Sequence, residues 1–184
     1  MKFEQHTTTS APDAAKPELQ AAEAAFGAIP NLYRGLANSP AALKIYLKFN
    51  ETLKEHGNLT AIEQQVVYLT ASAENGCTYC VGAHSTLANM ANIPEDTLKE
   101  LREQRQLSDP KLNALRNFTL EELEKRGWVS EQAIADFETA GYDHSHALEV
   151  ITILAQKTIS NYFNHIAQTP LDDMFAPTKW ESTN

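Results

Sequence analysis

The sequence predicts an all-α protein with a single domain. Apolar residues recur at the spacing of a helix face in segment after segment, and no stretch shows the alternation typical of a half-buried strand. Residues that commonly begin helices precede several of these segments, and glycine or asparagine often follows them. A chain of 184 residues is long enough to bury one hydrophobic core without a metal or a disulfide.

The predicted helices begin after a polar stretch. Residues 1–17 are rich in threonine, alanine and proline, and we expect them to form a mobile N-terminal arm, so that the helical domain spans residues 18–184. Serine caps free amides and proline suits a first helical turn, so Ser39-Pro40 should begin a helix. The first three helices are therefore expected over residues 18–26, 29–37 and 40–57.

Thr60 and Glu63 form a capping-box pattern, in which each side chain satisfies a free backbone amide at a helix start. The helix that they open carries apolar residues on more than one face, so it should be central. Asn75 and Gly76 interrupt it, because both residues tolerate the left-handed turn that closes a helix. The following helices are expected from about residue 77 to 91 and over residues 95–104, 110–127, 130–140 and 145–168.

Composition narrows the classes of function. The chain has 24 acidic residues against 15 lysine and arginine residues, and its net charge of −9 disfavours nucleic acid and anionic membranes as partners. We find neither a secretory signal pattern nor an apolar stretch long enough for a membrane span, so we expect a cytoplasmic protein. In a reducing compartment, two cysteines spaced Cys-x-x-Cys indicate metal binding or thiol chemistry rather than a structural disulfide.

Both cysteines lie in residues 74–84, which read Glu-Asn-Gly-Cys-Thr-Tyr-Cys-Val-Gly-Ala-His. An α-helix turns by 100° per residue, so an unbroken helix would place four residues on one face: Glu74, Cys77, Cys80 and His84. The imidazole of His84 would lie one turn from Cys80, where it could take the thiol proton or stabilise a thiolate. If a helix starts at Cys77, its loose first turn can bring the two β-carbons as close as a disulfide requires. The positive end of the helix dipole would also lower the pKa of a thiol there. This pattern predicts an activated thiol pair.

Two other interpretations of the cysteines remain open. Buried cysteines can serve as simple packing residues, although packing alone does not explain why an acid, a histidine and a helix break accompany them. A zinc site would draw its ligands from Cys77, Cys80, His84 and either Glu74 or the pair His144 and His146. The second half of a usual structural zinc motif is missing, so we expect no metal and no cofactor. His165, near the end of the last helix, is expected to have a structural role.

Residues 60–85 carry Asn-Gly followed by Cys-x-x-Cys-x-x-x-His, and residues 157–172 form a matching closing segment. Both stretches resemble the alkylhydroperoxidase D-like, peroxidase-related branch of the carboxymuconolactone decarboxylase family. The resemblance implies an all-helical bundle that assembles as a homo-oligomer, often a trimer or a hexamer. It also implies reduction of organic hydroperoxides or hydrogen peroxide in antioxidant defence, or thiol exchange serving a peroxiredoxin, with a lipoyl-bearing or thioredoxin-like electron donor.

The resemblance also implies roles for single residues. Cys80 would attack the peroxide, Cys77 would resolve the sulfenic acid as a disulfide, and His84 would belong to a proton relay. The family pattern has a glutamate twelve residues before the first cysteine, where this chain has Gln65, which cannot accept a proton. Of the substitutes Glu74 and Glu63, we expect Glu74 to complete the relay.

Two further hypotheses stay open at this point. One is a redox-sensing or interaction protein that oxidises its thiols with little turnover. The other is non-redox lyase chemistry of the decarboxylase type, which the cysteine pair disfavours because the decarboxylases proper lack it.

Overall fold

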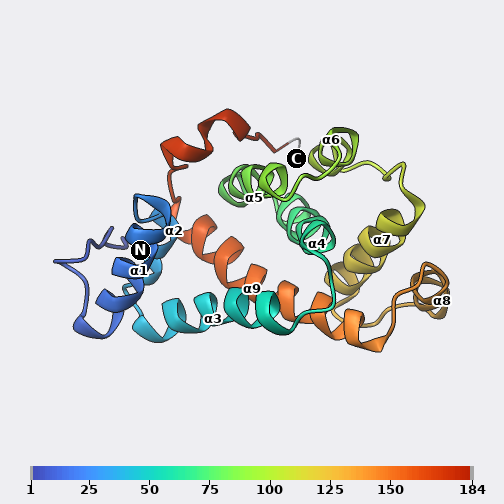
Figure 1. The fold of residues 1–184 in the computed structure, drawn as a ribbon, viewed down its shortest axis with the longest axis horizontal. Helices are drawn as coiled ribbons and strands as arrows, with labels where there is room; N and C mark the ends of the chain where they lie inside the picture. Colours follow the sequence, from blue (N-terminus) through green and yellow to red (C-terminus); the bar gives the residue numbers. More distant parts are fainter. Residues whose placement is uncertain (1, 183–184) are drawn as a thin grey trace.

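The computed structural model describes residues 2–182, and these residues form helices and no β-strand (Figure 1). The predicted all-α class is therefore confirmed. Within the described residues no helix is both long and apolar enough to cross a bilayer. The elements are η1 (Asp13–Ala15), α1 (Lys16–Phe26), α2 (Asn31–Leu36), α3 (Pro40–His56), α4 (Ala61–Glu74), α5 (Thr78–Met90), α6 (Glu95–Arg102), α7 (Pro110–Lys125), α8 (Glu131–Thr139), α9 (His144–Ala167) and η2 (Asp173–Thr178).

Helix α4 lies at the centre of the bundle, as its apolar residues on several faces predict. It packs against α5, α7 and α9 and also touches α6 (Figure 1). The long helices α3 and α9 lie side by side, and the C-terminal turn η2 covers α5. Residues 91–143 separate α5 from α9 in the sequence, yet both helices pack on α4.

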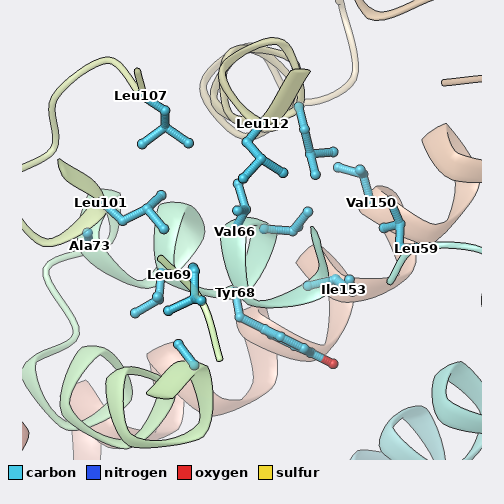
Figure 2. Packing of buried hydrophobic residues seen from close by; sticks show 14 of the residues in the cluster. Leu59, Val66, Tyr68, Leu69, Ala73, Leu101, Leu107, Leu112, Val150 and Ile153 are labelled. Carbon is cyan, nitrogen blue, oxygen red and sulfur yellow. The ribbon is translucent and has the colours of Figure 1, made fainter. Parts of the chain in front are cut away.

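The core around α4 is made of tightly packed aliphatic side chains. Figure 2 shows Val66 and Leu69 of α4 surrounded by side chains from other helices, including Leu112 of α7 and Ile153 of α9. Val66, Leu69 and Ile153 are completely buried. Removing such a side chain from water contributes about 1.5–3 kcal/mol each. A second cluster, formed with α1, α2 and α3, includes both cysteines, so the dithiol lies within packed apolar structure.

The predicted helix ends are mostly in place. The Thr60 hydroxyl accepts a hydrogen bond from the Glu63 amide, and the Glu63 carboxylate accepts one from the Thr60 amide, which completes the capping box. Ser39 caps α3, Gly27 ends α1 in the left-handed conformation, and Gly76 has a φ of 65° in the break between α4 and α5. These local signals therefore determine where α4 ends and α5 begins, and the cysteines lie at that connection.

The N-terminal residues do not form the free arm that their composition suggests. The His6 amide donates to the Arg34 carbonyl at 3.3 Å, and Arg34 Nε donates back to the His6 carbonyl at 3.1 Å. Phe3 packs edge-on against Phe163 of α9, and Ala15 is fully buried. Helix α1 also begins at Lys16, two residues before the expected boundary. Buried alanine residues and hydrogen bonds to Arg34 of α2 hold this segment, and its composition does not reveal these tertiary contacts.

Helix α9 buries a polar face. Val150 and Ile153 in its first half are buried in the core, but from Gln156 onward its buried residues are polar, whereas Leu148 is 62% and Ile166 60% exposed. The buried polar residues recur at helical spacing: Gln156, Lys157, Ser160, Asn161 and Asn164. A buried polar face requires partners, and several of these residues find them at the dithiol.

Glu63 is a buried carboxylate with a full set of partners, and it should make stability depend on pH. Lys111 Nζ lies 2.9 Å from Glu63 Oε1, and the Tyr142 hydroxyl donates to the same oxygen at 3.0 Å. Burial would raise the pKa of Glu63, but the hydrogen bonds from Lys111, Thr60 and Tyr142 outweigh it and lower the pKa to about 2. The ionised carboxylate therefore stabilises the fold above its ordinary pKa of 4.5, and this stabilisation is lost as pH falls from 4.5 towards 2.

We expect Glu63→Gln to lower the free energy of unfolding by about 2 kcal/mol at pH 7, after a discount for the solvent screening of half-exposed Lys111. The gap between variant and wild type should shrink towards zero near pH 2. Urea denaturation at several pH values measures it, with exposed Glu124→Gln as the matched control. A gap of the same size at pH 7 and pH 2.5 would contradict the assignment.

Candidate active site

The dithiol lies at the junction of α4 and α5. Helix α4 ends at Glu74, Gly76 makes the left-handed turn, and the Cys77 amide donates to the Ser72 carbonyl at 2.9 Å. Cys77 then occupies the N-cap position of α5, with Cys80 in the first turn. Both thiols are free, and only 1% of Cys77 and 2% of Cys80 is exposed. The helix start beside Cys77 is where the sequence predicts it.

The two sulfurs differ in charge state. Burial would raise the pKa of Cys80, but the neighbouring Cys77 thiol, the charge of Lys157 and the side-chain amides of Asn164 and Asn161 lower it to about 5. Asn164 Nδ2 lies 3.2 Å from Cys80 Sγ and 3.8 Å from Cys77 Sγ. The pKa of Cys77 is raised, first by the hydrogen bond that it donates to Cys80 and then by burial. At neutral pH the pair therefore holds one proton, with the negative charge on Cys80.

His84 is fixed in one tautomer. Lys157 Nζ lies 2.9 Å from His84 Nε2, and an ammonium group can only donate, so Nε2 accepts. Nδ1 must then carry the proton, which it donates to Gln65 Oε1 at 3.0 Å. Burial and the charge of Lys157 both lower the pKa of His84, so the ring is neutral. Tyr68 stacks on the imidazole with ring centroids 4.4 Å apart and holds its plane.

The expected contact between Glu74 and His84 is not made. Glu74 is exposed as the last residue of α4, and its charge acts on Arg116. Both ring nitrogens of His84 are used by Gln65 and Lys157. The physical reason is the helix break: the single-face argument requires one continuous helix, but Glu74 and His84 belong to two. Gln65 thus contacts the histidine itself.

Three residues at the site come from α9 and were missed by sequence reasoning. Lys157 reaches His84, Asn164 reaches both sulfurs, and Asn161 accepts a hydrogen bond from Asn75 Nδ2 at 2.9 Å. Lys157 is 1% exposed, and Asn161 is fully buried. The signal that could have found them is the polar stripe at helical spacing within an otherwise apolar helix.

An apolar cavity of about 290 Å³ leads to Cys80. Its lining includes Cys80, His84 and Lys157 together with mainly aromatic and aliphatic side chains, among them Tyr33, Tyr46, Leu87 and Phe175. Tyr79 closes one side, where its hydroxyl donates to Asp172 Oδ2 at 2.6 Å and accepts from the Leu32 amide at 3.3 Å. An apolar molecule entering this cavity would meet the thiolate and an ammonium group together.

The zinc alternative gains no support from the arrangement of side chains. In residues 2–182 no cluster of three or more His, Cys, Asp and Glu side chains is placed to hold a metal ion. His144 and His146 begin α9, where His146 Nδ1 lies 2.7 Å from Asp143 Oδ1 in a helix cap. His146 therefore helps to cap that helix.

The fold and the site define an all-helical protein with a buried Cys-x-x-Cys dithiol at a helix start. Residues 40–120 match the model of the Carboxymuconolactone decarboxylase family. The matched residues include the segment in which the sequence resembles the alkylhydroperoxidase D-like branch, and the structural comparisons agree with the all-helical fold that this resemblance implies. No curated protein sequence gave a significant match.

Solved structures share the fold across most of the chain. An uncharacterised peroxidase-related protein with an alkylhydroperoxidase AhpD core, from Ralstonia eutropha, superposes with a TM-score of 0.85 at 20% identity, covering 95% of this chain and 93% of that one. An uncharacterised peroxidase-related protein from a Silicibacter species gives 0.76 at 15% identity, covering 89% and 87%. The debrominase Bmp8 gives 0.74 at 14% identity, with 90% of each chain covered. At these identities the comparisons show the fold alone.

Proposed function

We propose that the protein is a thiol-dependent peroxidase that reduces organic hydroperoxides through the dithiol Cys77 and Cys80. The observation that carries the proposal is the low pKa of Cys80 at the floor of an apolar cavity. A thiolate is the reactive form of cysteine, and burial normally disfavours it, so its stabilisation by Lys157, Asn161 and Asn164 indicates a nucleophile. A cysteine used only for packing would need none of these contacts.

In the first step, Cys80 Sγ attacks the terminal oxygen of the hydroperoxide. The sulfur–oxygen bond forms as the O–O bond breaks, so that sulfur is oxidised to a sulfenic acid and the peroxide is reduced to an alcohol. The departing alkoxide needs a proton, and Lys157 is suited to donate it because it lines the cavity and its charge acts on Cys80. His84 accepts from Lys157 and thereby positions the ammonium group.

In the second step, the Cys77 thiol attacks the sulfenic acid sulfur of Cys80. A disulfide forms, and the hydroxyl leaves as water with the proton of Cys77. The position of the two sulfurs supports this step, because Asn164 Nδ2 lies within 3.2 Å of Cys80 Sγ and 3.8 Å of Cys77 Sγ. An external thiol must then return two electrons to the pair.

The cellular setting is part of the same proposal. A dithiol cycle needs a reducing compartment, so we place the protein in the cytoplasm, with a lipoyl-bearing or thioredoxin-like reductant.

The homo-oligomer is proposed on the exposed apolar side chains of α9, including Leu148, Ile151 and Ile166. Light scattering of the purified protein would test it, and a monomeric mass would contradict it.

The cavity also supports a second candidate, the removal of halogen from a small aromatic compound. Its aromatic lining and volume of about 290 Å³ suit such a ring, and the debrominase Bmp8, also solved in complex with 2,3,4-tribromopyrrole, has the same fold. Bromide release from 2,3,4-tribromopyrrole, measured beside hydroperoxide consumption, separates the two candidates.

The first step is tested by trapping its product. In Cys77→Ser the sulfenic acid cannot be resolved, so one equivalent of cumene hydroperoxide should leave a dimedone-reactive sulfenic acid on Cys80. Wild type should instead lose two thiols and gain an intramolecular disulfide. Mass spectrometry of labelled peptides reads both outcomes. A sulfenic acid on the lone cysteine of Cys80→Ser, formed as fast as on Cys80, would overturn the order of attack.

A further inference from the structure

The two cysteines face two different hollows. The apolar cavity is lined by Cys80 and not by Cys77, whereas a separate cleft of about 310 Å³ is lined by Cys77 and not by Cys80. The second cleft lies between the start of α5 and the end of α9. Its lining is mostly polar: Gly76, Thr78, Tyr79, Asn164, His165, Gln168 and Thr169. The dithiol therefore separates an apolar entrance from a polar one.

Two residues that line the polar cleft each carry a buried polar atom without a hydrogen-bond partner. The atoms are Asn164 Oδ1 and Thr169 Oγ1, and the two residues are only 5% and 9% exposed. The amide nitrogen of Asn164 is engaged with sulfur, so its carbonyl oxygen is left as a free acceptor. A buried acceptor without a donor is costly, and a ligand N–H at this place would satisfy it. The exposed residues Thr78, His165 and Gln168 leave the cleft open to such a ligand.

We propose that this cleft receives the electron donor, a slender thiol carrying an amide N–H, which reduces the disulfide by attacking Cys77. The inference rests on the proposed dithiol cycle and adds where, and at which sulfur, electrons enter. Cys77 is 1% exposed at the base of the cleft, which suits a thiol on a narrow chain rather than on a broad protein surface. The chain could be a free small thiol or an unstructured arm of a protein, since both present the same chemistry.

The exchange is balanced through a mixed disulfide. The donor thiolate attacks Cys77 Sγ, the Cys77–Cys80 bond breaks, and Cys80 leaves with the electron pair. A second donor thiol then attacks the donor sulfur, releases Cys77 and leaves an oxidised donor disulfide. Cys80 is the better leaving group because Lys157, Asn161 and Asn164 stabilise its thiolate. The donor is thus expected to attack Cys77, and this is the cysteine that lines the polar cleft.

Two filling variants test the separation of the entrances. Thr78→Trp narrows the polar cleft, and Leu87→Trp narrows the apolar cavity, with Thr78→Val as a control of unchanged size. The disulfide is made chemically with diamide, and its reduction by glutathione is followed by thiol counting. Oxidation of the reduced protein by cumene hydroperoxide is followed separately. We expect Thr78→Trp to slow reduction at least about tenfold and leave oxidation unchanged, and Leu87→Trp to do the reverse.

The outcomes separate the two proposals. Equal slowing of both half-reactions by Thr78→Trp, or slowing of neither, would overturn the cleft assignment. Because diamide forms the disulfide without a peroxide, failure of cumene hydroperoxide to oxidise wild type would overturn the proposed function alone. Glutathione and a carrier protein with an unstructured cysteine-containing tail distinguish the two sources of the thiol. Fast reduction by a folded thioredoxin that is insensitive to Thr78→Trp would contradict the slender donor.

Discussion

Cys80→Ser is expected to lose at least about a thousandfold of hydroperoxide turnover. A serine hydroxyl stays protonated at neutral pH and is a far weaker nucleophile towards the O–O bond than a thiolate. The loss should appear already in a single turnover, because the bond-forming atom itself is changed. Consumption of cumene hydroperoxide with an excess of thiol reductant measures the steady state, and rapid mixing measures the single turnover.

Cys77→Ser is the matched control for the same chemical change at the other sulfur. It should consume about one equivalent of hydroperoxide per chain, because Cys80 still attacks, and then slow to the rate at which external thiol reduces the sulfenic acid. Cys77 also donates a hydrogen bond to Cys80, which a serine hydroxyl can replace, so the first turnover should be nearly as fast as in wild type. Steady turnover by Cys80→Ser at the parent rate would refute the peroxidase assignment.

Local sequence signals were sufficient for the chain segment that carries the thiols. The capping box at Thr60 and Glu63, the turn at Gly76 and the Cys-x-x-Cys spacing each act over a few residues, and each is found where it was predicted. They locate the helix start at Cys77 because backbone amides and left-handed turns impose the same demands in any fold. The reactive pair could thus be found without tertiary information.

The partners of the pair could not be found in this way. Lys157 and Asn164 lie more than seventy residues after Cys80, and only the packing of α9 against α4 and α5 brings them to the site. The direct contact expected between Glu74 and His84 is absent for a related reason. The prediction placed Glu74 and His84 on one helical face, although the same sequence predicts a helix break at Gly76 between them. Positions on a helical face can be compared only within one continuous helix.

Lys157→Met should lower turnover at pH 7 about a hundredfold and move the pH profile to higher pH. Without the ammonium group, the pKa of Cys80 moves back towards its ordinary value of 9.0, so only a small part remains thiolate at pH 7. A more basic thiolate is also a better nucleophile, which offsets much of that loss. The remaining effect is the missing stabilisation of the departing alkoxide, for which one preorganised donor contributes about a hundredfold.

The pH profile distinguishes this role from a purely structural one. Wild type should be nearly flat above pH 6, because Cys80 is already ionised, whereas Lys157→Met should gain activity steadily towards pH 9. Methionine has a similar volume and carries no charge, so it should be tolerated in the core. Exposed Lys54→Met removes the same charge from the surface and should keep the wild-type profile. If Lys157→Met lost activity equally at every pH, Lys157 would support the fold of the site without ionising Cys80. We assign the lysine to the thiolate because its positive charge lowers the pKa of Cys80.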